Sequence, residues 1–84
     1  MVKVLYFARL REALGTSAEE IALPRSVSTL NGLRAQLVAR GGAWTEAFAP
    51  DRRVRAAVNQ TMADDETAIV DGDEIAFFPP VTGG

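Results

Sequence analysis

The sequence predicts a small α+β domain in which one main helix lies across a mixed β-sheet. Alternating apolar residues near both ends, within 2–8 and 74–78, predict strands, and a third alternating stretch covers 53–60. Between them, apolar residues at helical spacing run through 26–38 and predict an amphipathic helix. A chain of 84 residues makes one domain that buries about 60–65% of its unfolded surface, with no room for a deep cleft.

The composition excludes several classes of function. There is no cysteine and no histidine, so the chain has no disulfide, no thiolate zinc site and no usual general base at neutral pH. A net charge of −2 provides no basic surface for nucleic acid. No apolar run reaches the ~20 residues that cross a membrane, and the strand-like N-terminus lacks a cleavage pattern. We therefore expect a cytoplasmic protein whose partners are proteins and small molecules, with no metal.

The N-terminal region predicts a pair of strands joined by a short helix. In the strand at 2–8, one face carries Val2, Val4, Tyr6 and Ala8, and the wetter face carries Lys3, Leu5 and Phe7. A helix at 9–14 closes at Gly15, and a second strand at 17–23 ends before Pro24. Leu5 and Phe7 are candidates for an exposed apolar patch, unless another element covers them.

The main helix is predicted to begin at Ser26 as N-cap and to end at Gly41-Gly42. Gly32 inside it costs about 1 kcal/mol relative to alanine, so burial has to stabilise the helix. The buried stripe is expected to consist of Val27, Leu30, Leu33, Leu37 and Val38.

The second half of the chain is predicted to contain a small aromatic cluster, a third strand and a solvated turn. Trp44 and Phe48, four residues apart, indicate one or two helical turns and a satellite core. In the strand at 53–60, Val54, Ala56 and Val58 face inward, and Arg55, Ala57 and Asn59 face outward. A turn at 63–66 precedes a short apolar piece at 67–70 and a tight turn at 71–73. The acidic cluster lacks the ligand spacing of a calcium loop, which favours a solvated turn.

The last strand leads directly into the C-terminus. Ile75 and Phe77 point to one face, and Ala76 and Phe78 to the other. Pro79 and Pro80 lack backbone donors, so the strand should end at Phe78. Gly83-Gly84 has no side chains and can enter a channel too narrow for other residues. The Gly84 carboxylate is thus the candidate reactive group.

The order strand, strand, helix, strand, short piece, strand is that of the β-grasp, or ubiquitin-like, fold, in which the first and last strands are central neighbours. We expect a β-grasp domain over 1–80 and a flexible reactive tail over 81–84.

The sequence resembles the family of small, sulfur-carrying subunits of molybdopterin synthase over nearly its whole length. The resemblance is strongest in three stretches: Lys3-Val4-Leu5-Tyr6-Phe7-Ala8 with Arg11-Glu12, Ala56-Ala57-Val58-Asn59-Gln60-Thr61, and 71–84, which reads DGDEIAFFPPVTGG. The stretch from Ala43 to Asp51 carries little of it.

The resemblance implies a reaction at the C-terminus. An E1-like activating enzyme would use ATP to form an acyl-adenylate on Gly84, and a sulfur donor such as a cysteine desulfurase relay would replace AMP to leave a thiocarboxylate. The sulfur would pass to a pyranopterin precursor in the synthase large subunit, which would carry the catalytic side chains. Val81, Thr82 and Gly83 would form the rest of the active-site tail, with no cofactor bound to the carrier and two small and two large subunits assembled.

The resemblance also implies a partner-binding patch made of Phe7, Met62 and Phe78, with Arg11 and Arg55 as rim charges or ordinary surface residues. Three alternatives remain open: a thiamine-type sulfur carrier, a modifier that forms isopeptide bonds with lysines, and a β-grasp interaction module with an idle tail.

Overall fold

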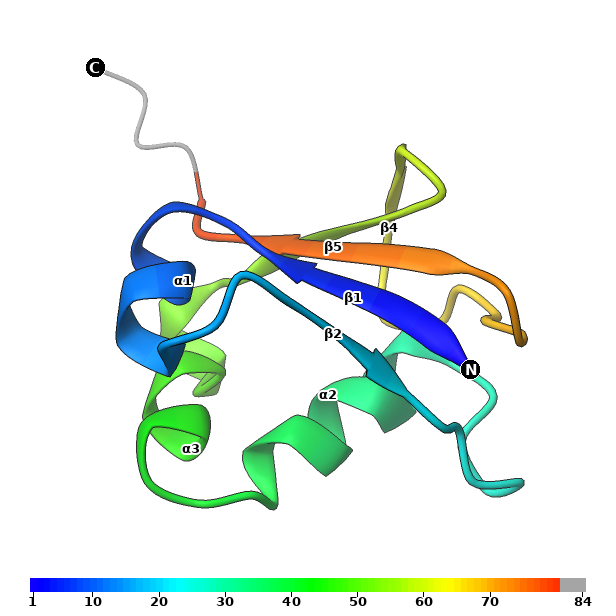
Figure 1. Cartoon of the computed structure of the whole chain (residues 1–84), viewed down its shortest axis with the longest axis horizontal. Helices are drawn as coiled ribbons and strands as arrows, with labels where there is room; N and C mark the ends of the chain where they lie inside the picture. The colour runs from blue at the N-terminus through cyan, green and yellow to red at the C-terminus, as the bar shows by residue number, and fades with distance from the viewer. Residues whose placement is uncertain (81–84) are drawn as a thin grey trace.

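The computed structural model describes residues 1–80 and shows a mixed five-stranded sheet with helices against one face (Figure 1). Its elements are β1 (Val2–Tyr6), α1 (Ala8–Leu14), β2 (Ala18–Ile21), α2 (Leu30–Val38), α3 (Ala43–Ala47), the 3-10 helix η1 (Pro50–Arg52), β3 (Arg55–Val58), β4 (Thr61–Ala63) and β5 (Glu74–Phe78).

The sheet has the strand order β2-β1-β5-β3-β4, which confirms the prediction that the first and last strands are central neighbours. β1 and β5 pair in parallel, with Tyr6 opposite Phe77, whereas the other pairs are antiparallel. Residues from the two ends of the chain therefore form the middle of the sheet. The chain leaves the sheet from β5, the central strand, which is paired on both sides.

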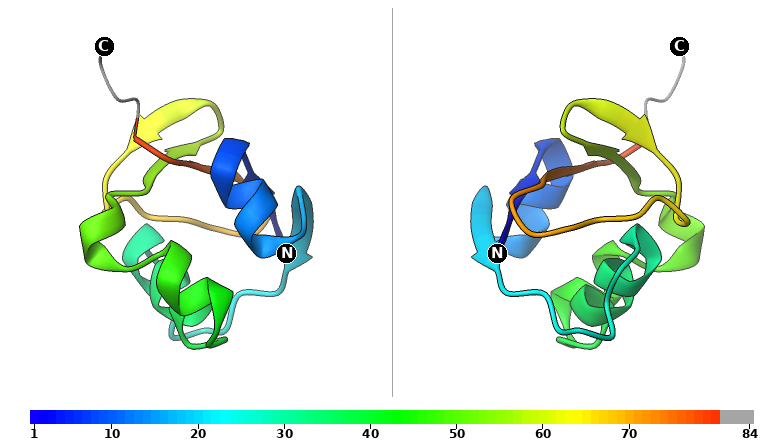
Figure 2. Two further views of the ribbon diagram at one scale, coloured as in Figure 1. Left: turned by 90° about the vertical axis from the view of Figure 1, so that its left-hand side faces the viewer. Right: turned by 90° about the vertical axis from the view of Figure 1, so that its right-hand side faces the viewer.

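The core lies between the sheet and α2. Leu30, Leu33 and Leu37 of α2 are buried, as predicted. The inner sheet face meets them with Val2, Val4, Tyr6, Ile75 and Phe77, none more than 1% exposed. Figure 2 shows α2 and α3 together on one side of the strands.

The predicted aromatic cluster joins this core. The ring of Phe48 lies 5.1 Å from that of Phe77 in an edge-to-face arrangement, and Trp44 lies 5.4 Å from Tyr6 in the same geometry. Such pairs contribute about 0.5–1.5 kcal/mol beyond area burial. The stretch with the least family resemblance thus completes the packing beneath the end of β5.

The main helix begins later than predicted. Thr29, not Ser26, is the N-cap: its backbone is extended and its Oγ1 accepts a hydrogen bond from the Gly32 N–H at 3.3 Å. Val27 is buried in the preceding loop, and a Cβ at Gly32 would lie 3.2 Å from Val27 Cγ1. Gly32 therefore leaves room for the loop that brings the chain into the helix.

The sequence interpretation missed β4. Asn59 and Gln60 have φ values of +50° and +69°, so the chain reverses there and β3 pairs with β4 as a hairpin. Two left-handed residues are typical of the tight turns that match strand twist. The usual Asn-Gly signal for such a turn is absent, because Gln60 stands where the glycine would be. The alternation therefore predicts one continuous strand here and no turn.

The first strand is shorter than predicted, whereas the helix after it ends where it was predicted to end. β1 ends at Tyr6, and Ala8, expected on the inner face of the strand, is exposed at the start of α1 with φ +53°. The chain turns here after the Phe7 N–H donates to the Phe77 carbonyl at 3.1 Å, the last bond of the parallel pair. Gly15 closes α1 in the left-handed conformation, as predicted.

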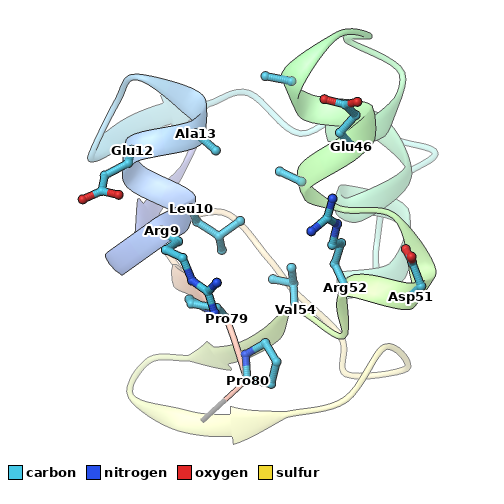
Figure 3. A pocket seen from close by; sticks show the side chains of 12 residues that line it. Arg9, Leu10, Glu12, Ala13, Glu46, Asp51, Arg52, Val54, Pro79 and Pro80 are labelled. Atoms are coloured by element: carbon cyan, nitrogen blue, oxygen red, sulfur yellow. The ribbon is translucent and has the colours of Figure 1, made fainter. Parts of the chain in front are cut away.

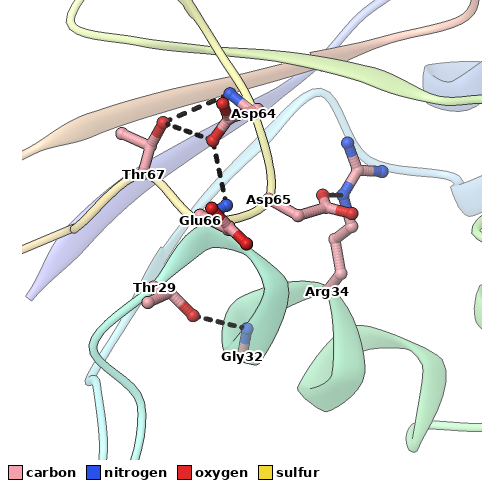
Figure 4. Close-up of polar contacts among 7 residues, drawn as sticks. All are labelled: Thr29, Gly32, Arg34, Asp64, Asp65, Glu66 and Thr67. Atoms are coloured by element: carbon pink, nitrogen blue, oxygen red, sulfur yellow. Dashed lines mark hydrogen bonds and ion pairs between the residues drawn. The ribbon is translucent and has the colours of Figure 1, made fainter.

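The acidic turn before β5 is held by its own side chains (Figure 4). Asp64 Oδ1 accepts hydrogen bonds from the Glu66 N–H at 3.0 Å and the Thr67 hydroxyl at 3.2 Å, and Asp65 pairs with Arg34 Nε at 2.8 Å. The cluster thus shapes a solvated turn and ties it to α2.

Within residues 1–80, every helix is too short or too polar to cross a bilayer.

Candidate functional site

The candidate site lies where β5 ends and the chain leaves the sheet. The strand stops at Phe78, as predicted, and Pro79 and Pro80 follow it. The predicted tail residues Val81, Thr82, Gly83 and Gly84 lie outside the described residues. The described part of the site consists of the surfaces around this exit, which is formed by Phe78, Pro79 and Pro80.

The outer face of the sheet, opposite α2, carries an apolar row that crosses all five strands. Because paired residues point to the same face, the register defines its members. This outer apolar row consists of Ala18, Leu5, Ala76, Ala57 and Met62.

The row is flat at its centre and raised at one edge. Ala57 and Ala76 are small, and neighbouring strands already cover Ala57 to 9% exposure, although it was expected on a solvated face. Met62 on β4 is 51% exposed and stands at the edge of the row. A shallow apolar surface with a flexible thioether at its rim can accommodate another protein.

The two sides of the row differ in polarity. On one side Lys3 lies opposite Glu20 and Glu74, which makes a charged row at the start of β5. On the other side, at the exit, Phe78 lies opposite Arg55. The exposed Phe7 lies next to this pair, because its N–H bonds the Phe77 carbonyl. The apolar surface is thus continuous with the exit.

The three residues predicted to contact a partner lie on or beside this surface. Phe7 is 46% exposed and Phe78 is half-buried, and both lie beside the exit. Met62 lies two strands from Phe78, and Ala57 and Ala76 connect it with the rest. Sequence reasoning identified Leu5 but missed these two alanines, whose only signal was their alternate spacing in strands that also carry buried residues.

An open groove of about 730 Å³ adjoins the exit, between α1, α3 and the end of β5 (Figure 3). Arg9 and Leu10 form one wall, Arg52 and Val54 the other, and Pro79 and Pro80 line it where the chain leaves the sheet. Sequence reasoning did not identify Arg9 or Arg52, because only the fold brings α1 and η1 to the same place.

A polar network holds Tyr6, the residue that pairs with Phe77 near the end of β5. The Tyr6 hydroxyl donates to Glu19 Oε2 at 2.7 Å, and Arg40 donates to both Glu19 oxygens at 2.8 and 2.9 Å. The Arg40 guanidinium also lies 4.4 Å from the centre of the Trp44 ring. The hydrogen bonds from Arg40, more than the one from Tyr6, hold the pKa of Glu19 below its usual range. Burial and Glu19 raise the pKa of the Tyr6 phenol.

These groups are structural, since they bond one another and face inward or toward α2. Within the part of the chain that the structure describes, no three His, Cys, Asp or Glu side chains gather to hold a metal ion. What the described surface offers is an apolar face, a groove and a strand end. Such a surface can hold a partner protein against the end of β5.

Comparison with known proteins places the chain among sulfur carriers. A model of the ThiS family matches residues 4–84. The molybdopterin synthase sulfur carrier subunit of Escherichia coli K12 is 46% identical, with 100% of both chains covered.

Two solved structures share the fold. Small archaeal modifier protein 1 of Haloferax volcanii superposes with a TM-score of 0.77 at 26% identity, covering 95% of this chain and 97% of that one. One chain of the complex of subunits 1 and 2 of the molybdopterin-converting factor from Helicobacter pylori superposes with a TM-score of 0.67 at 27% identity. The match covers 99% of this chain and 97% of that one.

Proposed function

This chain belongs to the ThiS family, and from that membership we propose that it is the sulfur-carrier subunit of a molybdopterin synthase. The full-length 46% identity with the Escherichia coli sulfur carrier subunit carries the proposal. The geometry fits it, because the central strand β5 ends at Phe78 beside an apolar surface that a partner can hold.

The chemistry belongs to the Gly84 carboxylate. An activating enzyme transfers AMP from ATP to this carboxylate with release of pyrophosphate, since a free carboxylate is a poor electrophile. A sulfur donor then displaces AMP, which leaves a thiocarboxylate. The terminal sulfur attacks a carbon of the pyranopterin precursor and forms a thioester, and water then attacks the Gly84 carbonyl and breaks its C–S bond, which leaves the sulfur on the pterin and a carboxylate on Gly84. The carrier thus supplies the nucleophile and is not an enzyme by itself.

Positioning by the large subunit supplies most of the rate. The outer apolar row, with Phe7 and Phe78 beside the exit, is the surface on which the large subunit and the activating enzyme dock in turn. The complex of subunits 1 and 2 in the Helicobacter pylori factor supports a two-subunit assembly. We assign Val81, Thr82 and Gly83 to the part of the carrier that enters the partner's active site.

Intact mass tests the proposal. The protein is incubated with ATP, its activating enzyme and a sulfur source, and replacement of oxygen by sulfur adds about 16 Da. Leaving out ATP is the control, because it removes the leaving group. An unchanged mass in the complete mixture, with a folded protein and an activating enzyme shown to be active on another carrier, contradicts the proposal.

A second candidate is a protein modifier that forms isopeptide bonds with lysines. The similarity to small archaeal modifier protein 1 favours it, and it shares the activated intermediate. The two functions differ in the product: a modifier yields protein amides that resist thiols and hydroxylamine, whereas a carrier yields the thiocarboxylate. Mass spectrometry of the same reaction, with cell extract added, separates them.

A further inference from the structure

The basic residues of this chain are almost all arginines: eight arginines accompany a single lysine, Lys3. Both side chains are cationic at neutral pH, but they differ toward an activated acyl group. A lysine amine becomes a nucleophile when it loses its proton, whereas a guanidinium keeps its proton and does not attack. The choice therefore matters wherever an acyl group is activated.

Three of the arginines surround the exit, and each comes from a different element. Arg9 of α1 and Arg52 of η1 line the groove together with Pro79 and Pro80 (Figure 3). Arg55 of β3 lies opposite Phe78. Within residues 1–80 the ion pairs involve Arg34, Arg40 and the N-terminus, so these three form none there. The groove is also lined by the carboxylates of Glu12, Glu46 and Asp51, so the arginines lie among anions there, and none of these groups is an amine.

The amines lie at the other end of the β1–β5 pair. Lys3 is level with Glu74, the first residue of β5, and it sits between Glu74 and Glu20. The Met1 amine is 3.0 Å from Asp71 Oδ1. Because a strand rises about 3.3 Å per residue, the four steps from Glu74 to Phe78 separate Lys3 from the exit by roughly 13 Å.

We propose that Arg9, Arg52 and Arg55 are specificity-determining residues, because a guanidinium at these positions cannot capture activated Gly84 as a lysine amine would. This inference rests on the proposed function, in which Gly84 is activated. In the reaction that is avoided, a neutral lysine nitrogen attacks the Gly84 carbonyl carbon. A C–N bond forms, the bond to AMP or to a thiol breaks with its electron pair, and the amine proton passes to solvent.

The direction of the chain, more than its reach, distinguishes the exit positions from Lys3, since both lie within the length of the last six residues. Gly84 follows Phe78 by six residues, which span at most roughly 20 Å when extended, so an amine at the exit is within reach of its own C-terminus. An intramolecular amine acts at a high effective concentration, so even its small neutral fraction competes with water. Lys3 is reached only if the chain doubles back over the outer face, against the direction set by Pro79 and Pro80.

The test uses the full chain prepared as a thioester of Gly84 with a small thiol, which requires no activating enzyme. Arg9→Lys, Arg52→Lys and Arg55→Lys are compared with the wild type and with Arg25→Lys. Arg25 follows β2, whose last residue Ile21 pairs with Val2, so this control adds a lysine at the far end of the sheet. Thermal unfolding checks that every variant is folded, and added glycine ethyl ester checks that each thioester reacts with amines.

At pH 8.5 the thioester either hydrolyses to the carboxylate or forms an internal amide, whose mass is about 18 Da lower. We expect the ratio of amide to carboxylate to rise about tenfold or more in the three exit variants, and to match the wild type in Arg25→Lys. Fragment spectra must place the branch at the new lysine, and the yield must not depend on protein concentration.

Equal ratios in the exit variants, the control and the wild type would overturn the inference, as would efficient capture by Lys3 in the wild type. Failure of the proposed function looks different, because it appears as no gain of 16 Da in the enzymatic reaction. The thioester experiment does not depend on that outcome.

Discussion

Phe77 and Phe78 are neighbours on β5 and face opposite sides of the sheet. Phe77 is fully buried, and its ring lies 6.3 Å from that of Tyr6 with an angle of 12° between the planes. Phe78 is half-buried on the outer face, opposite Arg55. One residue thus holds the strand in the fold, and the next presents an aromatic side chain at the exit.

This difference predicts opposite effects of the same substitution. Phe77→Ala should lower the free energy of unfolding by about 3–5 kcal/mol, because it leaves a cavity among Tyr6, Phe48 and Ile75. Phe78→Ala should cost less than about 1 kcal/mol and weaken binding to the large subunit. Urea unfolding and calorimetric titration measure the two effects. A Phe78 variant that unfolds as readily as the Phe77 variant would show that Phe78 belongs to the core.

Met62 provides a second test of the docking surface. Met62→Asp places a charge in the outer apolar row, so we expect affinity for the large subunit to fall about tenfold or more with little change in stability. Val70 is the matched control, since it is 63% exposed and follows the acidic turn, away from the row. Val70→Asp should leave affinity unchanged. Equal losses in both variants would mean that net charge, and not the row, determines binding.

Most of the fold could be predicted because its patterns are local. Alternation in 2–8 and 74–78 identified the central strands, and Phe77 and Phe78 were correctly assigned to opposite faces. The predicted start of α2 was wrong because Ser26 and Thr29 are both good N-cap residues. The burial of Val27 in the loop before the helix favours Thr29. β4 was missed because a three-residue strand has almost no pattern of its own.

The candidate site was harder to predict because it depends on pairing register. Phe7 and Phe78 could be placed on outer faces by alternation within their own strands. The continuity from Leu5 through Ala76 and Ala57 to Met62 appears only when four strands are aligned. Arg9 and Arg52 are more than forty positions apart in sequence, and only the packing of α1 beside α3 brings them to one groove.

The Glu19 network predicts a pH-dependent stability. The Glu19 pKa is lowered in the folded state, first by Arg40, so the ionised form stabilises the fold above the unfolded pKa of about 4.3. That contribution is lost as the pH falls through the lower folded pKa. Glu19→Gln should therefore destabilise by roughly 1–2 kcal/mol at pH 7, and the difference from the wild type should shrink below about pH 4.

Urea unfolding at pH 7 and pH 3 measures this difference. Glu20→Gln is the control, because Glu20 is exposed on the outer face of the same strand. It should change stability little at either pH. A difference for Glu19→Gln that stays constant between the two pH values would show that its effect comes from packing and not from ionisation.

Deleting Gly84 separates the fold from the chemistry. The core is formed by residues up to Phe77, so the free energy of unfolding should not change. The shortened chain still ends in a glycine carboxylate, but it falls short of the partner's reactive centre by up to about 3.6 Å. Because misplacement by 1 Å can cost about a hundredfold in rate, sulfur transfer should fall by at least that factor. Intact mass and single-turnover transfer measure the two steps, and adding one glycine back should restore both. Transfer at the full rate without Gly84 would show that another group carries the sulfur.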